Sequence, residues 1–312
     1  MRLVRWSNLL FLAALIGLME KWVAVPILEA AAFGEQLPGY MLLLLILATV
    51  GIAAGGYVIN DYFDVKIDRI NRPDELIVTN SISKPTAMKL SISLSAFGII
   101  CGMVVAVFLH SMTLGILFVI IPGLLWFYSS SYKRLLLIGN ITIALLAALT
   151  PLLVAMTNVA YLQLHYATVL PFLSLEHDLY AWMGGFALFA FLLTWIREVV
   201  KDMQDQMGDR EYECHSLPIV WGDLWTKIFV TGLIVFTLLV IGHLWYRVLP
   251  FDTSWLSLST RYIAFGVVTP LLGVLCLLWA AKIPSDYKTC QQLVKFTMLL
   301  GMLYSFVVLR GL

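Results

Sequence analysis

Nine apolar stretches, each long enough to cross a lipid bilayer, constrain this chain more than any other feature of its sequence. Such a stretch crosses the hydrocarbon core as a helix, because a helix satisfies its own backbone hydrogen bonds where there is no water. Hydrophobic residues make up 61% of the chain and charged residues 12%, which excludes an ordinary soluble domain. We predict an all-α, polytopic membrane protein with nine transmembrane helices in one bundle and a single domain over residues 1–312. The predicted spans are Asn8–Glu29, Tyr40–Ile59, Pro85–Leu109, Thr113–Ser129, Ile138–Asn158, Tyr180–Val200, Lys227–Tyr246, Ile263–Ala281 and Leu293–Leu309.

Lysine and arginine are distributed unevenly between the two sides that this topology defines. The side that receives the N-terminus and the loops after even-numbered spans holds 16 of the 20 basic residues. The other side holds Arg247, Arg261 and Arg310, and Lys21 lies within the first span. Because basic loops stay in the cytoplasm, we predict an integral protein of the cell (inner) membrane whose basic side is cytoplasmic. The first span follows Met-Arg-Leu-Val-Arg with no small-residue cleavage site, so we expect no cleaved signal peptide.

A triplet of aspartates occurs twice at the same spacing, after the second and the sixth span. Positions i, i+3 and i+7 lie within roughly 60° of one helix face, where carboxylates repel each other. Either triplet alone is also compatible with a solvated helix end, but the repetition favours two converging clusters on the cytoplasmic side. Such clusters suit Mg²⁺, which is held by a few carboxylates while substrate phosphates complete its shell. The predicted metal ligands are Asp61, Asp64, Asp68, Asp202, Asp205 and Asp209, of which Asp64, Asp68, Asp205 and Asp209 are expected to be catalytic.

Basic residues accompany both acidic segments. Arg72 follows the first triplet, Lys201 stands beside the second, and Lys133 with Arg134 lies in the loop after the fourth span. These cations are expected to contact phosphate oxygens that the metal does not reach. They are also compatible with ion pairs within a helix and, for Lys133 and Arg134, with a pure topology signal. No basic segment interleaved with aromatic residues points to nucleic acid.

A magnesium–phosphate site that opens into an apolar bundle suits an amphiphile with a diphosphate head and a hydrocarbon tail, such as a polyprenyl diphosphate. Metal and cations would stabilise the departing diphosphate, so that the allylic carbon becomes cation-like. Aromatic faces stabilise such a carbon and exclude water. Tyr128 and Tyr132 are the aromatic residues that we select for this role, although tyrosine also collects at membrane interfaces.

At these residues the sequence resembles the UbiA superfamily of intramembrane prenyltransferases. The family pattern Asn-Asp-x-x-Asp-x-x-x-Asp is matched by residues 60–68, and the second Asp-rich motif precedes Cys-His-Ser-Leu-Pro at residues 214–218. The resemblance covers essentially the whole chain. It implies nine helices, two Asp-rich cytoplasmic loops and Mg²⁺ that bridges both motifs to an isoprenyl diphosphate. It also implies a role for Asn60 in the first motif and for Arg72 and Lys133 near the diphosphate.

The acceptor is harder to predict. The string Asp-Val-Lys-Ile-Asp-Arg-Ile-Asn-Arg-Pro at residues 64–73 is most similar to the branch that contains geranylgeranylglyceryl-phosphate geranylgeranyltransferases and chlorophyll synthases. The resemblance therefore favours geranylgeranyl diphosphate as donor and geranylgeranylglyceryl phosphate as lipophilic acceptor. Dihydroxynaphthoate or 4-hydroxybenzoate remains the alternative, because His215 stands where that branch commonly has arginine. A transporter or cation-binding membrane protein is the alternative of another class, although its acids usually lie near the bilayer midplane.

Overall fold

The computed structural model describes residues 3–34, 36–168, 170, 174–247 and 257–308. Within this part of the chain, nine helices are long and apolar enough to cross a membrane, which confirms the predicted fold class. Arg310 and the end of the ninth predicted span lie outside the described residues. The described residues divide into two compact units, the first within the ranges 1–132 and 149–187 and the second within 133–148 and 188–312. The single domain stays a prediction.

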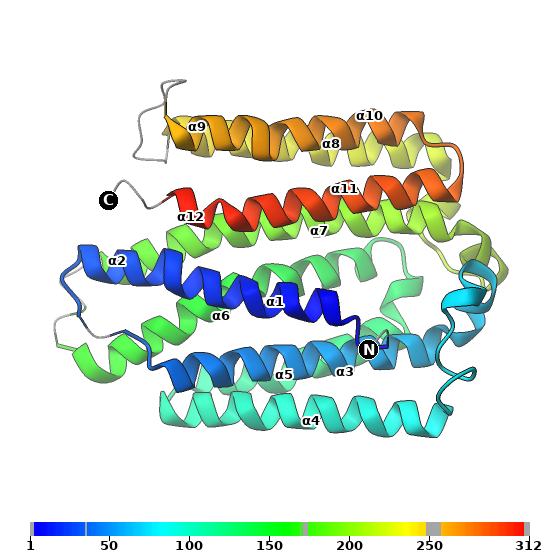
Figure 1. The fold of residues 1–312 in the computed structure, drawn as a ribbon. Helices are drawn as coiled ribbons and strands as arrows, with labels where there is room; N and C mark the ends of the chain where they lie inside the picture. Colours follow the sequence, from blue (N-terminus) through cyan, green and yellow to red (C-terminus); the bar gives the residue numbers. More distant parts are fainter. Residues whose placement is uncertain (1–2, 35, 169, 171–173, 248–256, 309–312) are drawn as a thin grey trace. The chain divides into compact units, whose positions relative to one another are not determined.

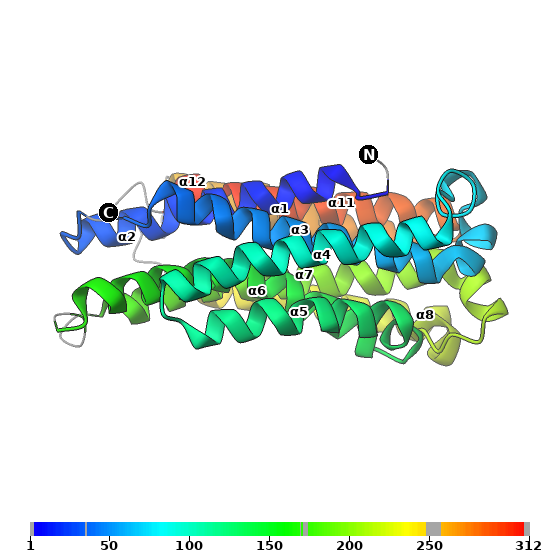
Figure 2. The ribbon, with the colours of Figure 1, turned by 90° about the horizontal axis from the view of Figure 1, so that it is seen from below.

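The first unit is built around the long helix α3 (Gly39–Asn71), which packs against three other helices (Figure 1). Its neighbours are α1 (Trp6–Met19), α4 (Lys84–Phe108) and α5 (Met112–Ser130). Figure 2 shows the same helices from below, where they again lie side by side. The first span continues from α1 through a π-helical turn, η1 (Glu20–Ala24), into α2 (Val25–Ala30), and a short 3-10 helix, η2 (Pro73–Glu75), follows α3. The last parts of the first unit belong to α6 (Ile138–Tyr166) and to the start of α7 (Leu175–Glu211).

Glycines bring α3 and α4 unusually close together. A Cβ atom added at Gly98 of α4 would lie 2.7 Å from both the Ala48 oxygen and the Ile52 nitrogen of α3. At Gly55 of α3 it would lie 2.9 Å from the Ser91 carbonyl oxygen, and the Ser91 hydroxyl donates to the Gly55 carbonyl across 2.9 Å. Small residues at such a contact allow the two backbones to approach, which is how helices associate in lipid.

The second unit contains the start of α6, the end of α7 and the helices after α7. These later helices are α8 (Leu217–Arg247), α9 (Leu258–Tyr262), η5 (Ile263–Val268), α10 (Thr269–Ala280), α11 (Pro284–Leu303) and α12 (Ser305–Val308). α10 packs against α8 and α11, and a cluster of buried apolar side chains joins them to Ile196, Val200 and Met203 of α7. α8 is kinked at Gly222, whose φ of 81° lies in the region that favours glycine.

Candidate active site

Helix α3 carries the whole first aspartate triplet. The predicted second span ends at Ile59 and the resemblance implies an Asp-rich loop after it, whereas the structure continues the span as a helix to Asn71. The helical spacing of the triplet agrees with this longer helix. The helix ends there because Arg72 precedes Pro73, and a residue before proline is disfavoured in the helical conformation. Val58 and Val65 of the same helix are buried in an apolar cluster, while the three aspartates remain half-buried. The packing of α3 therefore fixes the direction of its acidic face.

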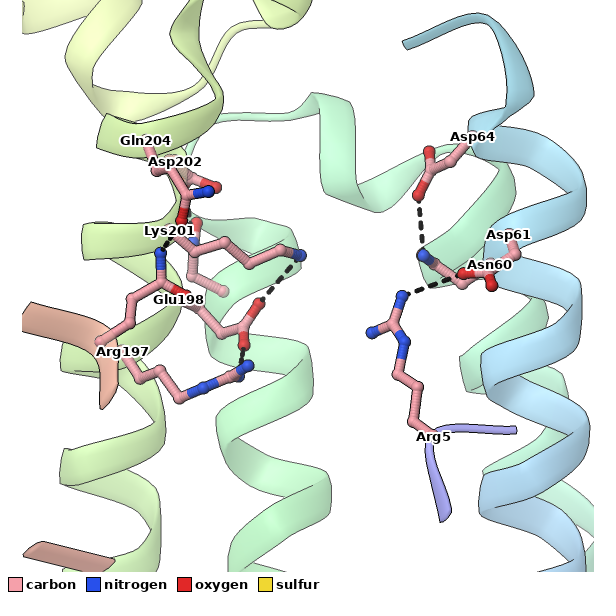
Figure 3. A network of polar contacts seen from close by, with 11 residues as sticks. Arg5, Asn60, Asp61, Asp64, Arg197, Glu198, Lys201, Asp202 and Gln204 are labelled. Atoms are coloured by element: carbon pink, nitrogen blue, oxygen red, sulfur yellow. Dashed lines mark hydrogen bonds and ion pairs between the residues drawn. The ribbon is translucent and has the colours of Figure 1, made fainter. Parts of the chain in front are cut away.

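Two of these aspartates are oriented by specific donors, as Figure 3 shows. The Asn60 side-chain amide, which is buried, donates to Asp64 Oδ2 across 2.7 Å. The Arg5 guanidinium donates to Asp61 Oδ1 across 2.9 Å and lies 5.1 Å from the centre of the Tyr57 ring. Asn60 thus positions a predicted catalytic carboxylate, and the side chain of Asp61 is held in an ion pair.

Arg5 is a residue of this site that the sequence did not predict. Burial lowers the pKa of its guanidinium, but the charge of Asp61, the Tyr57 and Tyr128 hydroxyls and the hydrogen bond to Asp61 together leave that pKa raised. Arg5 therefore stays charged and anchors the start of α1 to the acidic face of α3. A basic residue directly before the first span was the available signal, and it was counted only as a sign of topology.

Helix α7 carries the second triplet in the same way. It extends to Glu211, so Asp202, Asp205 and Asp209 also lie on a helix rather than in a loop, and all three are half-buried. The side-chain amide of Asn140, at the start of α6, donates to Asp202 Oδ2 across 2.8 Å. Asn140 is a buried polar residue near the start of an apolar span, and its role was not predicted from the sequence. It orients Asp202 as Asn60 orients Asp64.

One turn before the second triplet, a buried carboxylate lies between two cations (Figure 3). Glu198 is 5% exposed. Arg197 Nη1 contacts Glu198 Oε1, and Lys201 Nζ lies 3.8 Å from Glu198 Oε2. Lys201, a predicted substrate-binding residue, is thus oriented by Glu198.

The remaining predicted residues are placed as follows. Arg72 lies half-buried at the end of α3, and Tyr128 lies half-buried on the last turns of α5. Lys133 lies half-buried in a short 3-10 turn, η3 (Tyr132–Arg134), and Tyr132 of that turn stacks on Phe127. The Arg134 carbonyl accepts a backbone hydrogen bond of 2.9 Å from His215, which joins this turn to the segment after α7. Their roles in binding stay predictions.

The donor set of the two acidic faces fits Mg²⁺, because carboxylate oxygens are the ligands that this ion prefers. Among the residues that the structure describes, no group of three or more His, Cys, Asp or Glu side chains is arranged to hold a metal by itself. Mg²⁺ usually takes one or two carboxylates and completes its octahedron with water and substrate phosphates. The predicted six-carboxylate site stays a prediction, with one triplet in each unit.

The chain has long apolar helices, and two of them, α3 and α7, carry oriented carboxylates near their ends. These features define a multi-pass membrane protein with polar groups at the ends of its helices. The model of the UbiA prenyltransferase family matches residues 22–305. The chain belongs to this family, and the predicted enzyme class, a prenyltransferase, is thereby confirmed.

Relatives and solved structures agree with this assignment. The digeranylgeranylglyceryl phosphate synthase of Thermococcus gammatolerans is 32% identical over 211 residues, which cover 68% of this chain and 65% of that protein. The synthase of the same description from Methanosphaera stadtmanae is 28% identical over 263 residues, 83% of each chain. The alignment with the first relative therefore spans slightly less than two thirds of its length.

Two solved structures share the fold. One, described as digeranylgeranylglyceryl phosphate synthase in membranes, is 26% identical, with a TM-score of 0.62 over 100% of this chain and 97% of that chain. The other is a UbiA homologue from Archaeoglobus fulgidus bound to DMAPP and Mg²⁺, which is 14% identical, with a TM-score of 0.58 over 100% of this chain and 99% of that chain. The names of the relatives agree with the predicted branch of the family.

Proposed function

We propose that this protein transfers a geranylgeranyl group from its diphosphate to geranylgeranylglyceryl phosphate, with Mg²⁺ as cofactor. The observation that carries the proposal is the acidic face of α3, where Asn60 orients Asp64 in a chain that belongs to a prenyltransferase family. The relatives named digeranylgeranylglyceryl phosphate synthase support the acceptor. The homologue bound to DMAPP and Mg²⁺ supports the donor class and the metal.

In the proposed reaction the allylic C–O bond of the donor breaks, and the diphosphate leaves with the bonding electrons. Mg²⁺, held by Asp61, Asp64 and Asp68 together with Asp202, Asp205 and Asp209, would neutralise the charge that develops on the leaving group.

The residues of this chain supply the remaining parts of the site. Arg72, Lys133 and Lys201 are proposed to bind diphosphate oxygens that the metal does not reach. Asn60 and Asn140 hold their carboxylates in one orientation, so that little reorganisation is needed when charge develops. The ring face of Tyr128 is proposed to stabilise the electron-poor allylic carbon until the acceptor hydroxyl attacks it and loses its proton.

The orientation in the membrane is part of the proposal. The uneven distribution of Lys and Arg supports a site at the cytoplasmic face of the cell (inner) membrane. This orientation is tested by labelling single cysteines in sealed inverted membrane vesicles. A cysteine that replaces the exposed Lys66 beside the first triplet should react from the cytoplasmic side only, and reaction from the other side would overturn the orientation.

The reaction is tested with purified protein, Mg²⁺ and geranylgeranyl diphosphate. We expect release of diphosphate and a prenylated product with geranylgeranylglyceryl phosphate, and none with dihydroxynaphthoate or 4-hydroxybenzoate. A product with either aromatic compound alone would replace the proposed acceptor by a quinone precursor. Absence of release with every acceptor would refute the proposed reaction for these substrates.

A further inference from the structure

Arg197 on α7 is a half-buried cation that the proposed function does not use. Its guanidinium contacts Glu198 through Nη1, and its Nε is buried without a hydrogen-bond partner among the described residues. Ionisable residues inside a transmembrane helix are costly to retain, and they commonly mark a functional site. A buried donor without a partner adds a further cost.

The carboxylate of Glu198 compensates the buried charge of Arg197, but it cannot accept hydrogen bonds from all of the Arg197 N–H donors. Its Oε1 accepts from Arg197, while Lys201 Nζ lies 3.8 Å from its Oε2. One carboxylate therefore serves two cations, and these three side chains together retain a positive charge. The planar guanidinium presents more N–H donors than Glu198 accepts, in a fork that matches the oxygens of a phosphate.

Position along the helix places this fork next to the proposed chemistry. Lys201 follows Arg197 by four residues, and Asp205 follows Lys201 by four, so the three lie on adjacent turns of one stripe of α7. Arg197 is therefore on the same helix as the second aspartate triplet and between one and two turns before it.

We propose that Arg197 binds a phosphate oxyanion of a substrate through donors that Glu198 leaves available, and that Glu198 is the positioning residue that fixes the fork. This inference rests on the proposed function, since it names a further residue of the same site. The phosphate belongs either to the diphosphate of the donor or to the phosphate monoester of the acceptor. Both present the same oxygens to the guanidinium.

The experiment measures direct binding by calorimetry with the full-length protein in detergent, without turnover. The two probes are inorganic diphosphate with Mg²⁺ and glycerol phosphate. Replacing Arg197 with glutamine should weaken binding of one probe by about tenfold or more, because a hydrogen bond to a charged group is lost. Arg197→Lys should recover part of the affinity, since it restores the charge without the fork. Loss for diphosphate assigns the residue to the donor, and loss for glycerol phosphate assigns it to the acceptor.

Two further variants keep the test decisive. Arg210→Gln makes the same change at an exposed position of α7 and should leave both affinities unchanged. The double variant Arg197→Gln/Glu198→Gln removes both charges, so it leaves no unpaired buried carboxylate and should fold even where the single variant does not. Wild-type affinity for both probes in either folded variant would overturn the inference and return Arg197 to a structural ion pair. Because binding is measured without turnover, this outcome is distinguishable from a failure of the proposed reaction.

Discussion

Replacing Asn140 with leucine is expected to lower the apparent affinity of the enzyme for Mg²⁺ without changing any predicted metal ligand. The Asn140 amide donates to Asp202 Oδ2 across 2.8 Å, and its side chain is buried at the start of α6. A hydrogen bond to a charged group contributes about 1.5 to 3 kcal/mol, and each 1.4 kcal/mol corresponds to a factor of about ten. Residues that orient metal ligands typically affect metal affinity or activity by about 10- to 100-fold when replaced. We therefore expect a decrease in that range.

The assay is the initial rate of diphosphate release as a function of Mg²⁺ concentration at saturating prenyl diphosphate. The variant should need more Mg²⁺ for half-maximal rate, while its maximal rate should fall less, because excess metal restores the ligand geometry. Thr142→Val is the matched control. Among the contacts described, the Thr142 hydroxyl donates only to the Ile138 carbonyl of its own helix, across 2.7 Å. A folded Asn140→Leu variant with the wild-type dependence on Mg²⁺ would refute the reasoning and would remove Asp202 from the metal site.

Three other outcomes are expected. Asp205→Asn should abolish turnover while leaving a folded membrane protein, and near-normal rates would exclude this carboxylate from catalysis. Lys133→Ala should raise the Kd for prenyl diphosphate by about tenfold, as expected for loss of a charge-assisted hydrogen bond; an unchanged Kd would leave Lys133 as a topology signal. Asn158→Leu should lower the free energy of unfolding by about 1 to 3 kcal/mol, because Asn158 donates to the buried Glu20 across 2.6 Å. Adding Glu20→Leu should recover much of that loss in a thermal-unfolding assay, and a further decrease would contradict the account.

The number and approximate position of the helices were predictable from the sequence because lipid demands a long apolar segment for each crossing. The ends were less predictable. Hydropathy falls at the first aspartate of each motif, so Asp61 and Asp202 mark the end of the apolar segment and not the end of the helix, which continues to Asn71 and Glu211. A helix that leaves the hydrocarbon keeps its backbone hydrogen bonds, so a fall in hydropathy does not end it, whereas a proline such as Pro73 does.

The pairings between distant residues were not predictable. Asn60 and Asp64 are four residues apart on one helix, so their contact follows from helical spacing. The contacts of Arg5 with Asp61, and of Asn140 with Asp202, join residues more than fifty positions apart in the chain. They depend on how each helix is rotated about its axis, and hydropathy is almost uniform around a buried helix. For the same reason the sequence does not predict the hydrogen bond that Asn158 donates to Glu20, a residue 138 positions away in the chain.

The glycine contact between α3 and α4 has a consequence for how sequence variants of this enzyme should be interpreted. Gly55 lies nine residues before Asp64 on one continuous helix, so the two are about 14 Å apart along the axis. A methyl group added at Gly98 would meet the backbone of α3 itself, which cannot move aside as a flexible side chain can, so α3 and α4 must separate. Any part of this separation that α3 takes up would shift or tilt it as a rigid rod. Its acidic end would then move with it. A Gly98→Ala variant would thus bind the metal poorly, although the substitution lies far from the site and every residue of the site is unchanged.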